Sequence, residues 1–163
     1  MVGCSPDRAP VRASELADAQ AQADEATAVD FSGRSLNACG LLAREEVASA
    51  IGPLAGEPVA PAEDAADTAE GRCVWHGSDG RALSVAASEE GGAERLAAIP
   101  PGAVPAVSGS WEQARLQGCC LLHAVKDDAM VSLDFSAAGL ELAQAAGLAE
   151  RALARVHEPL DSP

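Results

Sequence analysis

The chain has 163 residues and a mass of 16.4 kDa, which suits one domain with a short extension rather than two domains. The net charge is −14 and Lys126 is the only lysine, so the chain lacks the basic surface that nucleic-acid binding requires. Hydrophobic residues make up 48% of the chain, but many are alanines, and the aromatic residues are two Trp and two Phe. We therefore expect a thin core built from small aliphatic side chains.

The first residues resemble the end of a bacterial lipobox. Gly3 precedes Cys4, as at sites where a signal peptidase cuts before a cysteine that carries a diacylglycerol. The charged and apolar regions typical of such a signal do not precede it in this sequence, and a chance Gly-Cys pair is the alternative. Residues 1–35 are polar and rich in alanine, without an apolar stripe. We interpret them as a lipobox remnant and a flexible tether, with Cys4 lipidated.

The next segments predict a helix, an acidic loop and a hairpin. Apolar residues recur at helical spacing through residues 43–51, and Gly52-Pro53 ends the helix. Residues 57–70 are rich in proline, alanine and carboxylates and form a solvated loop. Two short runs with strand character, 72–76 and 81–86, flank Gly77-Ser78-Asp79-Gly80, which predicts a β-hairpin.

The second half predicts a short helix, a second hairpin and a long final helix. The residues before the second hairpin fit either a strand or a helix. The expected elements are a short helix at 94–99, the undecided segment 111–117, strands at 119–125 and 130–135, and a helix from Ala137 to His157 capped by Ser136 and closed by Pro159.

This order of elements predicts an α+β fold. We expect an antiparallel sheet of two hairpins packed against an N-terminal and a long C-terminal helix. The single domain would cover residues 36–158, with residues 159–163 as a disordered tail.

The number of cysteines is odd. Lipidation of Cys4 leaves four, which can pair in three ways, and the sequence does not choose among them. Adjacent residues of a strand point to opposite faces, so a direct bond between Cys119 and Cys120 needs a distorted peptide, and one of them could remain a buried thiol. The alternative is a cytosolic protein whose cysteines are reduced core residues.

Several short motifs, in a fixed order from Leu36 to Val156, resemble a family of secreted bacterial lipoproteins of unknown function from high-GC genomes. The motifs are Cys39-Gly40-Leu41-Leu42, Glu45-Glu46-Val47 with Gly52, Cys73-Val74-Trp75, Gly109-Ser110-Trp111-Glu112-Gln113-Ala114, and a closing amphipathic helix. The resemblance implies a lipid-anchored protein outside the cytoplasm, a Cys39–Cys73 disulfide and no known activity.

The sequence departs from this family at three places. Ala43 stands where the family often has a capping Thr or Ser, and the turn at Asp128 lacks the usual glycine. The Cys119-Cys120 pair is not part of the family pattern, so the resemblance implies nothing about it.

One pattern favours a different function. Cys73-x-x-His76 and Cys120-x-x-His123 repeat the same spacing, and two cysteines with two histidines can bind zinc or copper. Residues three apart on a strand face opposite sides, which argues against a common metal site unless a turn intervenes. A metal-handling envelope protein is therefore the alternative hypothesis.

No catalytic motif is present in the sequence. Ser108 lacks the flanking glycines of a nucleophile elbow, and neighbouring acidic residues point apart. Trp111, beside a flexible loop, is a possible contact for a ligand or partner. We expect a non-enzymatic, membrane-anchored, extracytoplasmic domain that binds a protein, an envelope component or a small ligand. We expect a monomer without a cofactor or a nucleic-acid partner.

Overall fold

The computed structural model describes residues 36–61, 70–105 and 108–156. The expected lipobox, tether and C-terminal tail, together with lipidated Cys4, lie outside the described residues. The expected helix 94–99 is present as α3 (Gly92–Ala98), and the expected helix 43–51 is present as α2 (Arg44–Ile51). A short 3-10 helix, η1 (Ala38–Gly40), precedes α2.

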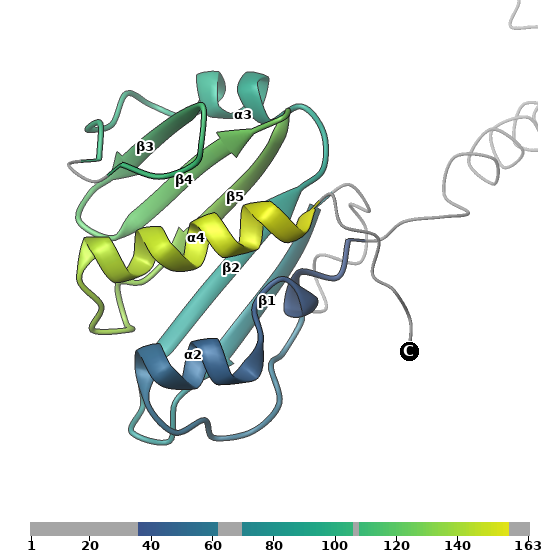
Figure 1. Ribbon diagram of the computed structural model, residues 1–163. Coiled ribbons are helices and arrows are strands. Elements are labelled where there is room, and N and C mark those ends of the chain that lie inside the picture. Colours follow the sequence, from purple (N-terminus) through teal and green to yellow (C-terminus); the bar gives the residue numbers. More distant parts are fainter. Residues whose placement is uncertain (1–35, 62–69, 106–107, 157–163) are drawn as a thin grey trace, which may run out of the picture. The chain divides into compact units, whose positions relative to one another are not determined.

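Five antiparallel strands form one sheet in the spatial order β1-β2-β5-β4-β3 (Figure 1). The two expected hairpins are β1–β2 and β4–β5, and pairing between β2 and β5 joins them, with Val85 opposite Leu133. The undecided segment before the second hairpin is a strand that pairs with β4. The strands are β1 (Glu70–His76), β2 (Ala82–Ser88), β3 (Gln113–Gln117), β4 (Leu121–Lys126) and β5 (Ala129–Asp134).

The last helix, α4 (Leu142–Val156), begins later than expected. The Ser136 hydroxyl donates a hydrogen bond to Asp134 at 2.7 Å instead of capping a helix, and Gly139 has a φ of 67°, outside the helical region. The helix begins where the Gln144 side chain accepts a hydrogen bond from the Glu141 N–H at 3.0 Å. The expected start at Ala137 is therefore wrong, while the helix itself and the α+β fold are confirmed.

The core lies between α4, α2 and one face of the sheet (Figure 1). On the opposite face the central strands carry small side chains, such as the half-buried Ser84, Ala86 and Ser132, whereas β4 and β3 place His123 and Arg115 there. Because α4 contacts the sheet through small residues, it can lie close to the strands. The fully buried strand residues on the core face include Leu83, Val85, Leu122, Val131 and Leu133, and those of α4 include Ala145, Ala149 and Ala152.

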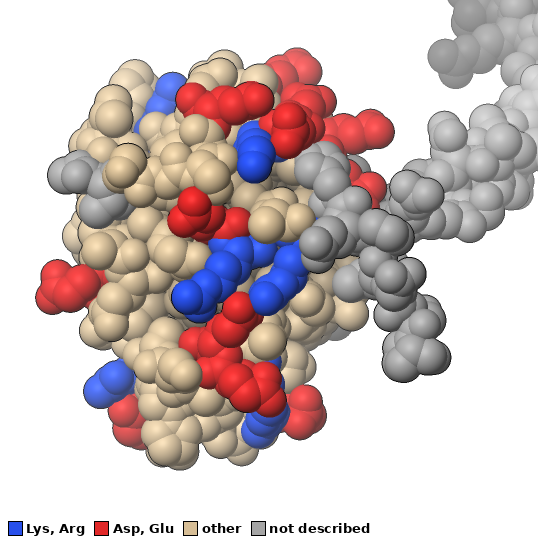
Figure 2. Space-filling model, in the orientation of Figure 1, with Lys and Arg blue, Asp and Glu red and all other residues tan. Residues whose placement is uncertain are grey.

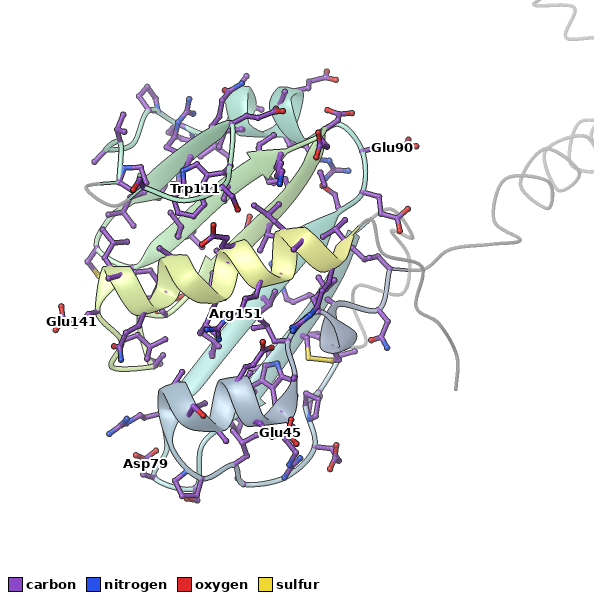
Figure 3. All side chains as sticks on the ribbon, in the orientation of Figure 1. Glu45, Asp79, Glu90, Trp111, Glu141 and Arg151 are labelled. Atoms are coloured by element: carbon purple, nitrogen blue, oxygen red, sulfur yellow. A yellow bond between two sulfur atoms is a disulfide. The ribbon has the colours of Figure 1, made fainter. Side chains whose placement is uncertain are left out.

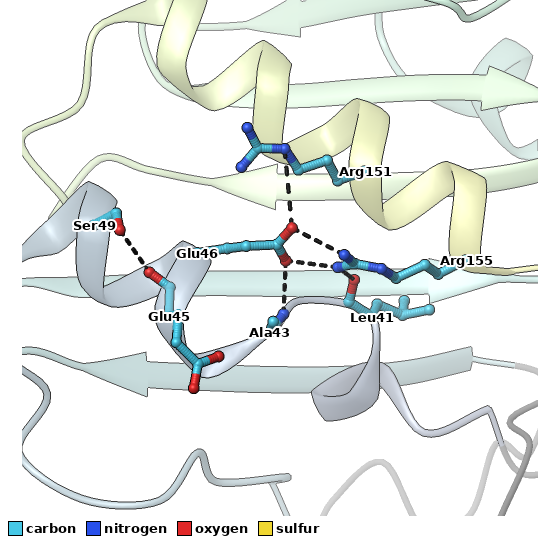
Figure 4. Close-up of polar contacts among 7 residues, drawn as sticks. All are labelled: Leu41, Ala43, Glu45, Glu46, Ser49, Arg151 and Arg155. Atoms are coloured by element: carbon cyan, nitrogen blue, oxygen red, sulfur yellow. Dashed lines mark hydrogen bonds and ion pairs between the residues drawn. The ribbon is translucent and has the colours of Figure 1, made fainter.

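An ion pair joins the two covering helices (Figure 4). Glu46 near the start of α2 accepts two hydrogen bonds from the Arg155 guanidinium on α4, at 2.6 and 2.9 Å. Arg155 also donates to the Leu41 carbonyl at 2.9 Å. Figure 2 shows basic and acidic side chains gathered between the two helices. A bidentate pair of this kind fixes both distance and orientation.

Glu46 also completes the N-terminus of α2. Its carboxylate accepts a hydrogen bond from the backbone N–H of Ala43 at 2.7 Å. Ala43 itself has no side-chain oxygen to cap the helix, so Glu46 supplies the acceptor for this end of α2. The hydrogen bonds from Arg155 outweigh the effect of burial and lower the pKa of Glu46 from 4.5 to about 2.

We expect Glu46→Gln to lower the free energy of unfolding at pH 7 by on the order of 2 kcal/mol, because charge-assisted hydrogen bonds to Arg155 are weakened. The pKa of Glu46 is depressed in the folded state to about 2. Its stabilisation is thus complete above about pH 4.5 and is lost as the pH falls towards 2. The difference between wild type and variant, measured by urea unfolding, should shrink over this range.

Glu45→Gln is the matched control, because Glu45 is the exposed neighbour of Glu46 on the same helix. Equal losses in the two variants at pH 7 would contradict a specific role for the Glu46–Arg155 pair.

Candidate functional site

The loop between α3 and β3 runs along the outer edge of the sheet. Within this loop, Ala103 pairs with Leu116 of β3 through two backbone hydrogen bonds of 3.0 and 2.8 Å. The pairing stops there, with Pro101 and Pro105 two residues on either side. Proline has no N–H to continue a ladder, so the loop touches the edge at one residue and then leaves it.

A groove opens where the loop leaves β3, with a volume of about 500 Å³. We call it the β3 groove. Its polar side chains are Ser108, Glu112, Gln113 and Arg115. Val104 at the rim is 85% exposed, which is unusual for a large apolar side chain in the described part of the chain. The surface around the loop in Figure 2 is largely uncharged. The apolar lining consists of Leu96, Pro101, Val104, Pro105, Trp111 and Ala114.

Trp111 forms one wall of the β3 groove. Figure 3 shows it on the α4 side of the sheet, beside the loop. Its ring is half-buried and packs against the core. A side chain at Gly109 would collide with this ring, so only glycine allows the loop to cross here. The indole therefore has one face on the protein and part of its surface open to the groove.

A contact with α4 fixes the loop next to Trp111. The backbone N–H of Ser110 donates a hydrogen bond to the Glu150 carboxylate at 2.9 Å. Hydrogen bonds from the side chain and the backbone of Ser110 lower the pKa of Glu150. Glu150 is on the helix that Arg155 connects to α2, so the position of α4 also determines that of the groove wall.

Arg115 positions the opposite wall. Its guanidinium donates hydrogen bonds to the carbonyls of Leu96 and Ile99 at 2.7 and 2.6 Å, at the end of α3. The Leu96 carbonyl also accepts the N–H of Ile99 at 3.3 Å, which closes the last turn of α3. A cation at this end of a helix suits the helix dipole. Arg115 therefore holds α3 and the start of the loop over β3.

His123 is a buried polar residue, and its burial was not predicted from the sequence. It is 6% exposed, on the sheet face opposite α4. One ring nitrogen, Nδ1, lies 2.7 Å from the Ser132 hydroxyl, and Nε2 lies 3.1 Å from the Gln117 side-chain oxygen. Three strands supply these residues, and both ring nitrogens are satisfied. Burial, and then the charge of Arg115, lower the pKa of His123.

Two disulfides lie in the described part of the chain. Cys39 of η1 bonds to Cys73 of β1, the pair that the family resemblance implied. Closing this loop of 34 residues stabilises the fold by about 3–4 kcal/mol in the chain-entropy model. Cys119 bonds to Cys120 in the turn before β4. The sequence left the state of these two cysteines open, and the bond forms because β4 begins at Leu121, so strand geometry does not apply to the pair.

The structure does not assemble the alternative metal site. Cys73 and Cys120 are in disulfides, so neither offers a thiolate. His76 is exposed on β1, whereas His123 is buried on β4, and two strands lie between them. Among the described residues, no group of three or more His, Cys, Asp or Glu side chains could hold a metal ion.

The other candidates from the sequence fall in different places. Trp111 lies at the β3 groove and Ser108 lies on its rim. No helix in the described ranges has the length and apolar character to cross a bilayer.

Comparison with known protein families, with curated proteins and with solved structures found no match to the chain. The resemblance to secreted lipoproteins therefore stays a prediction.

We expect the buried His123 to make the domain sensitive to acid. Its pKa is lowered in the folded state, so its contribution is complete above the ordinary histidine value of about 6.5 and is lost as the pH falls below it. His123→Gln should reduce the loss of unfolding free energy between pH 7.5 and 5.5, measured by urea denaturation. His76→Gln, at an exposed position, should leave that loss unchanged. The reverse pattern would contradict the assignment.

Proposed function

We propose that the domain is a non-enzymatic binding module that takes its ligand in the β3 groove. The observation that carries this proposal is the groove of about 500 Å³ with Trp111 in its wall. Binding sites are concave and mostly apolar, with a few polar groups that orient the ligand. The β3 groove combines apolar lining residues with the polar side chains of Ser108, Glu112, Gln113 and Arg115.

Hydrogen bonds within the protein fix both walls of the groove in the absence of a ligand. Glu150 fixes the loop at Ser110 on one side, and Arg115 fixes the end of α3 on the other. A site that is already formed loses little conformational entropy on binding. A partly exposed indole in such a site also offers a large contact area at low entropic cost.

We further propose that the module works outside the cytoplasm and is anchored to a membrane through lipidated Cys4. Disulfides form and persist mainly in oxidising compartments, and the described part of the chain contains two. The Gly3-Cys4 pair and the resemblance to secreted lipoproteins support the same location.

Binding is tested with the uncharged fluorescent probe N-phenyl-1-naphthylamine, titrated against the full chain. We expect the wild type to bind the probe and Trp111→Ala to lose most of this binding. Val104→Ser should weaken binding about fivefold, because an apolar contact worth roughly 1 kcal/mol is removed.

Val59→Ser is the matched control. Val59 is also exposed, at 52%, but it pairs with Val74 at the β1 edge, far from β3 in the strand order. Its replacement should leave probe binding unchanged. The proposal fails if the wild type does not bind the probe or if all three variants bind it equally.

The anchor is tested by mass spectrometry of the protein isolated from its native membrane. We expect the peptide that begins at Cys4 to carry a diacylglycerol on its sulfur. An unmodified Cys4 in the native product would contradict the proposed attachment and leave the groove proposal untouched.

A further inference from the structure

The outer edge of β3 has a pair of backbone groups to which no other described residue is bonded. The backbone groups of Leu116 point away from β4, because both bond to Ala103 of the loop. Successive residues of a strand direct their N–H and C=O groups to alternate sides in an antiparallel ladder. Ala114, two residues earlier, therefore presents its N–H and C=O to the same outer edge, and it lines the groove.

Proline keeps the loop from using these groups. In an antiparallel pairing of Ala103 with Leu116, the residue opposite Ala114 is Pro105. Proline cannot donate to the Ala114 carbonyl, and no hydrogen bond joins Ala114 to the described residues of the loop. Among the described residues, the loop bonds to this edge at Leu116 and not at Ala114, which lines the groove.

One acidic and one basic side chain line this opening, Glu112 and Arg115. The Arg115 guanidinium is directed to the α3 carbonyls, whereas the Glu112 carboxylate is exposed and can pair with a basic side chain of a ligand. The chain as a whole carries a net charge of −14, which attracts cationic ligands over a distance of about one Debye length.

From these observations, which rest on the proposed function of the groove, we infer that its ligand is an extended peptide. The peptide adds to the edge of β3 through the backbone of Ala114. Alternate side chains of an added strand point to opposite faces. Apolar side chains of the peptide then contact Trp111 and Val104, and basic side chains lie near Glu112.

The test measures the affinity of the full chain for the blocked pentapeptide Val-Lys-Val-Lys-Val by isothermal titration calorimetry. We compare it with two analogues: the same peptide with N-methyl groups on alternate backbone nitrogens, and Val-Glu-Val-Glu-Val. N-methylation along the pairing edge should weaken binding about tenfold, the effect of losing one main-chain hydrogen bond. The glutamate peptide should bind more weakly than the lysine peptide.

Substitutions in the protein test the same contacts. Ala114→Pro removes the N–H that points away from β4. The backbone hydrogen bonds between β3 and β4 are made by the residues on either side of Ala114 and are kept, and proline is tolerated at such an edge. We expect it to weaken the lysine peptide about tenfold, with Ala114→Ser as the control that keeps the N–H. Glu112→Gln should abolish the preference for lysine over glutamate. Circular dichroism confirms that each variant is folded.

The outcomes separate this inference from the proposed function. If the N-methylated peptide and the fluorescent probe bind as well as the unmodified peptide, the groove binds apolar ligands but not strands, and the inference is wrong. If no peptide binds, the inference is also wrong. If neither peptide nor probe binds, both the inference and the proposed function fail.

Discussion

The carboxylate of Glu46 connects the parts of the domain that its thin core would hold only weakly. It accepts two hydrogen bonds from Arg155 and one from the start of its own helix. Through Arg155 it fixes α4 against α2, and through α4 it determines where Glu150 meets the groove loop. The buried side of α4 consists largely of alanines, which contribute little apolar burial each. In such a helix, a few polar contacts with defined geometry determine orientation more than the packing does.

Periodicity predicted the elements that depend on local contacts. The hairpin around residues 77–80 and the helix before Gly52 follow from turn residues and apolar spacing, and both are present. Periodicity failed where a side chain bonds to a close neighbour in the chain and so interrupts the expected element. Ser136 bonds to Asp134 instead of capping a helix, and Cys119 bonds to its neighbour in a turn that looked like the start of a strand. Neither choice leaves a signal in hydrophobic spacing.

The candidate site was predictable only in part, because its residues meet through the register of the sheet. Trp111 could be singled out as a large apolar residue beside a loop, but its partners Leu96 and Ala114 come from separate elements. The hydrogen bonds of His123 also join three strands. The prolines on either side of Ala103 were visible in the sequence. Their meaning depends on the pairing of Ala103 with Leu116, which only the folded structure reveals.

The Cys39–Cys73 disulfide determines how the domain responds to a mechanical load. Tension applied from the N-terminal side enters the described chain at Leu36 and reaches Cys39 three residues later. The covalent bond then passes the force directly to β1. The bond bypasses the residues between the two cysteines, which include α2 and Glu46. A pull from the N-terminal side therefore cannot draw out the segment between Cys39 and Cys73, which contains α2, unless the disulfide is first reduced.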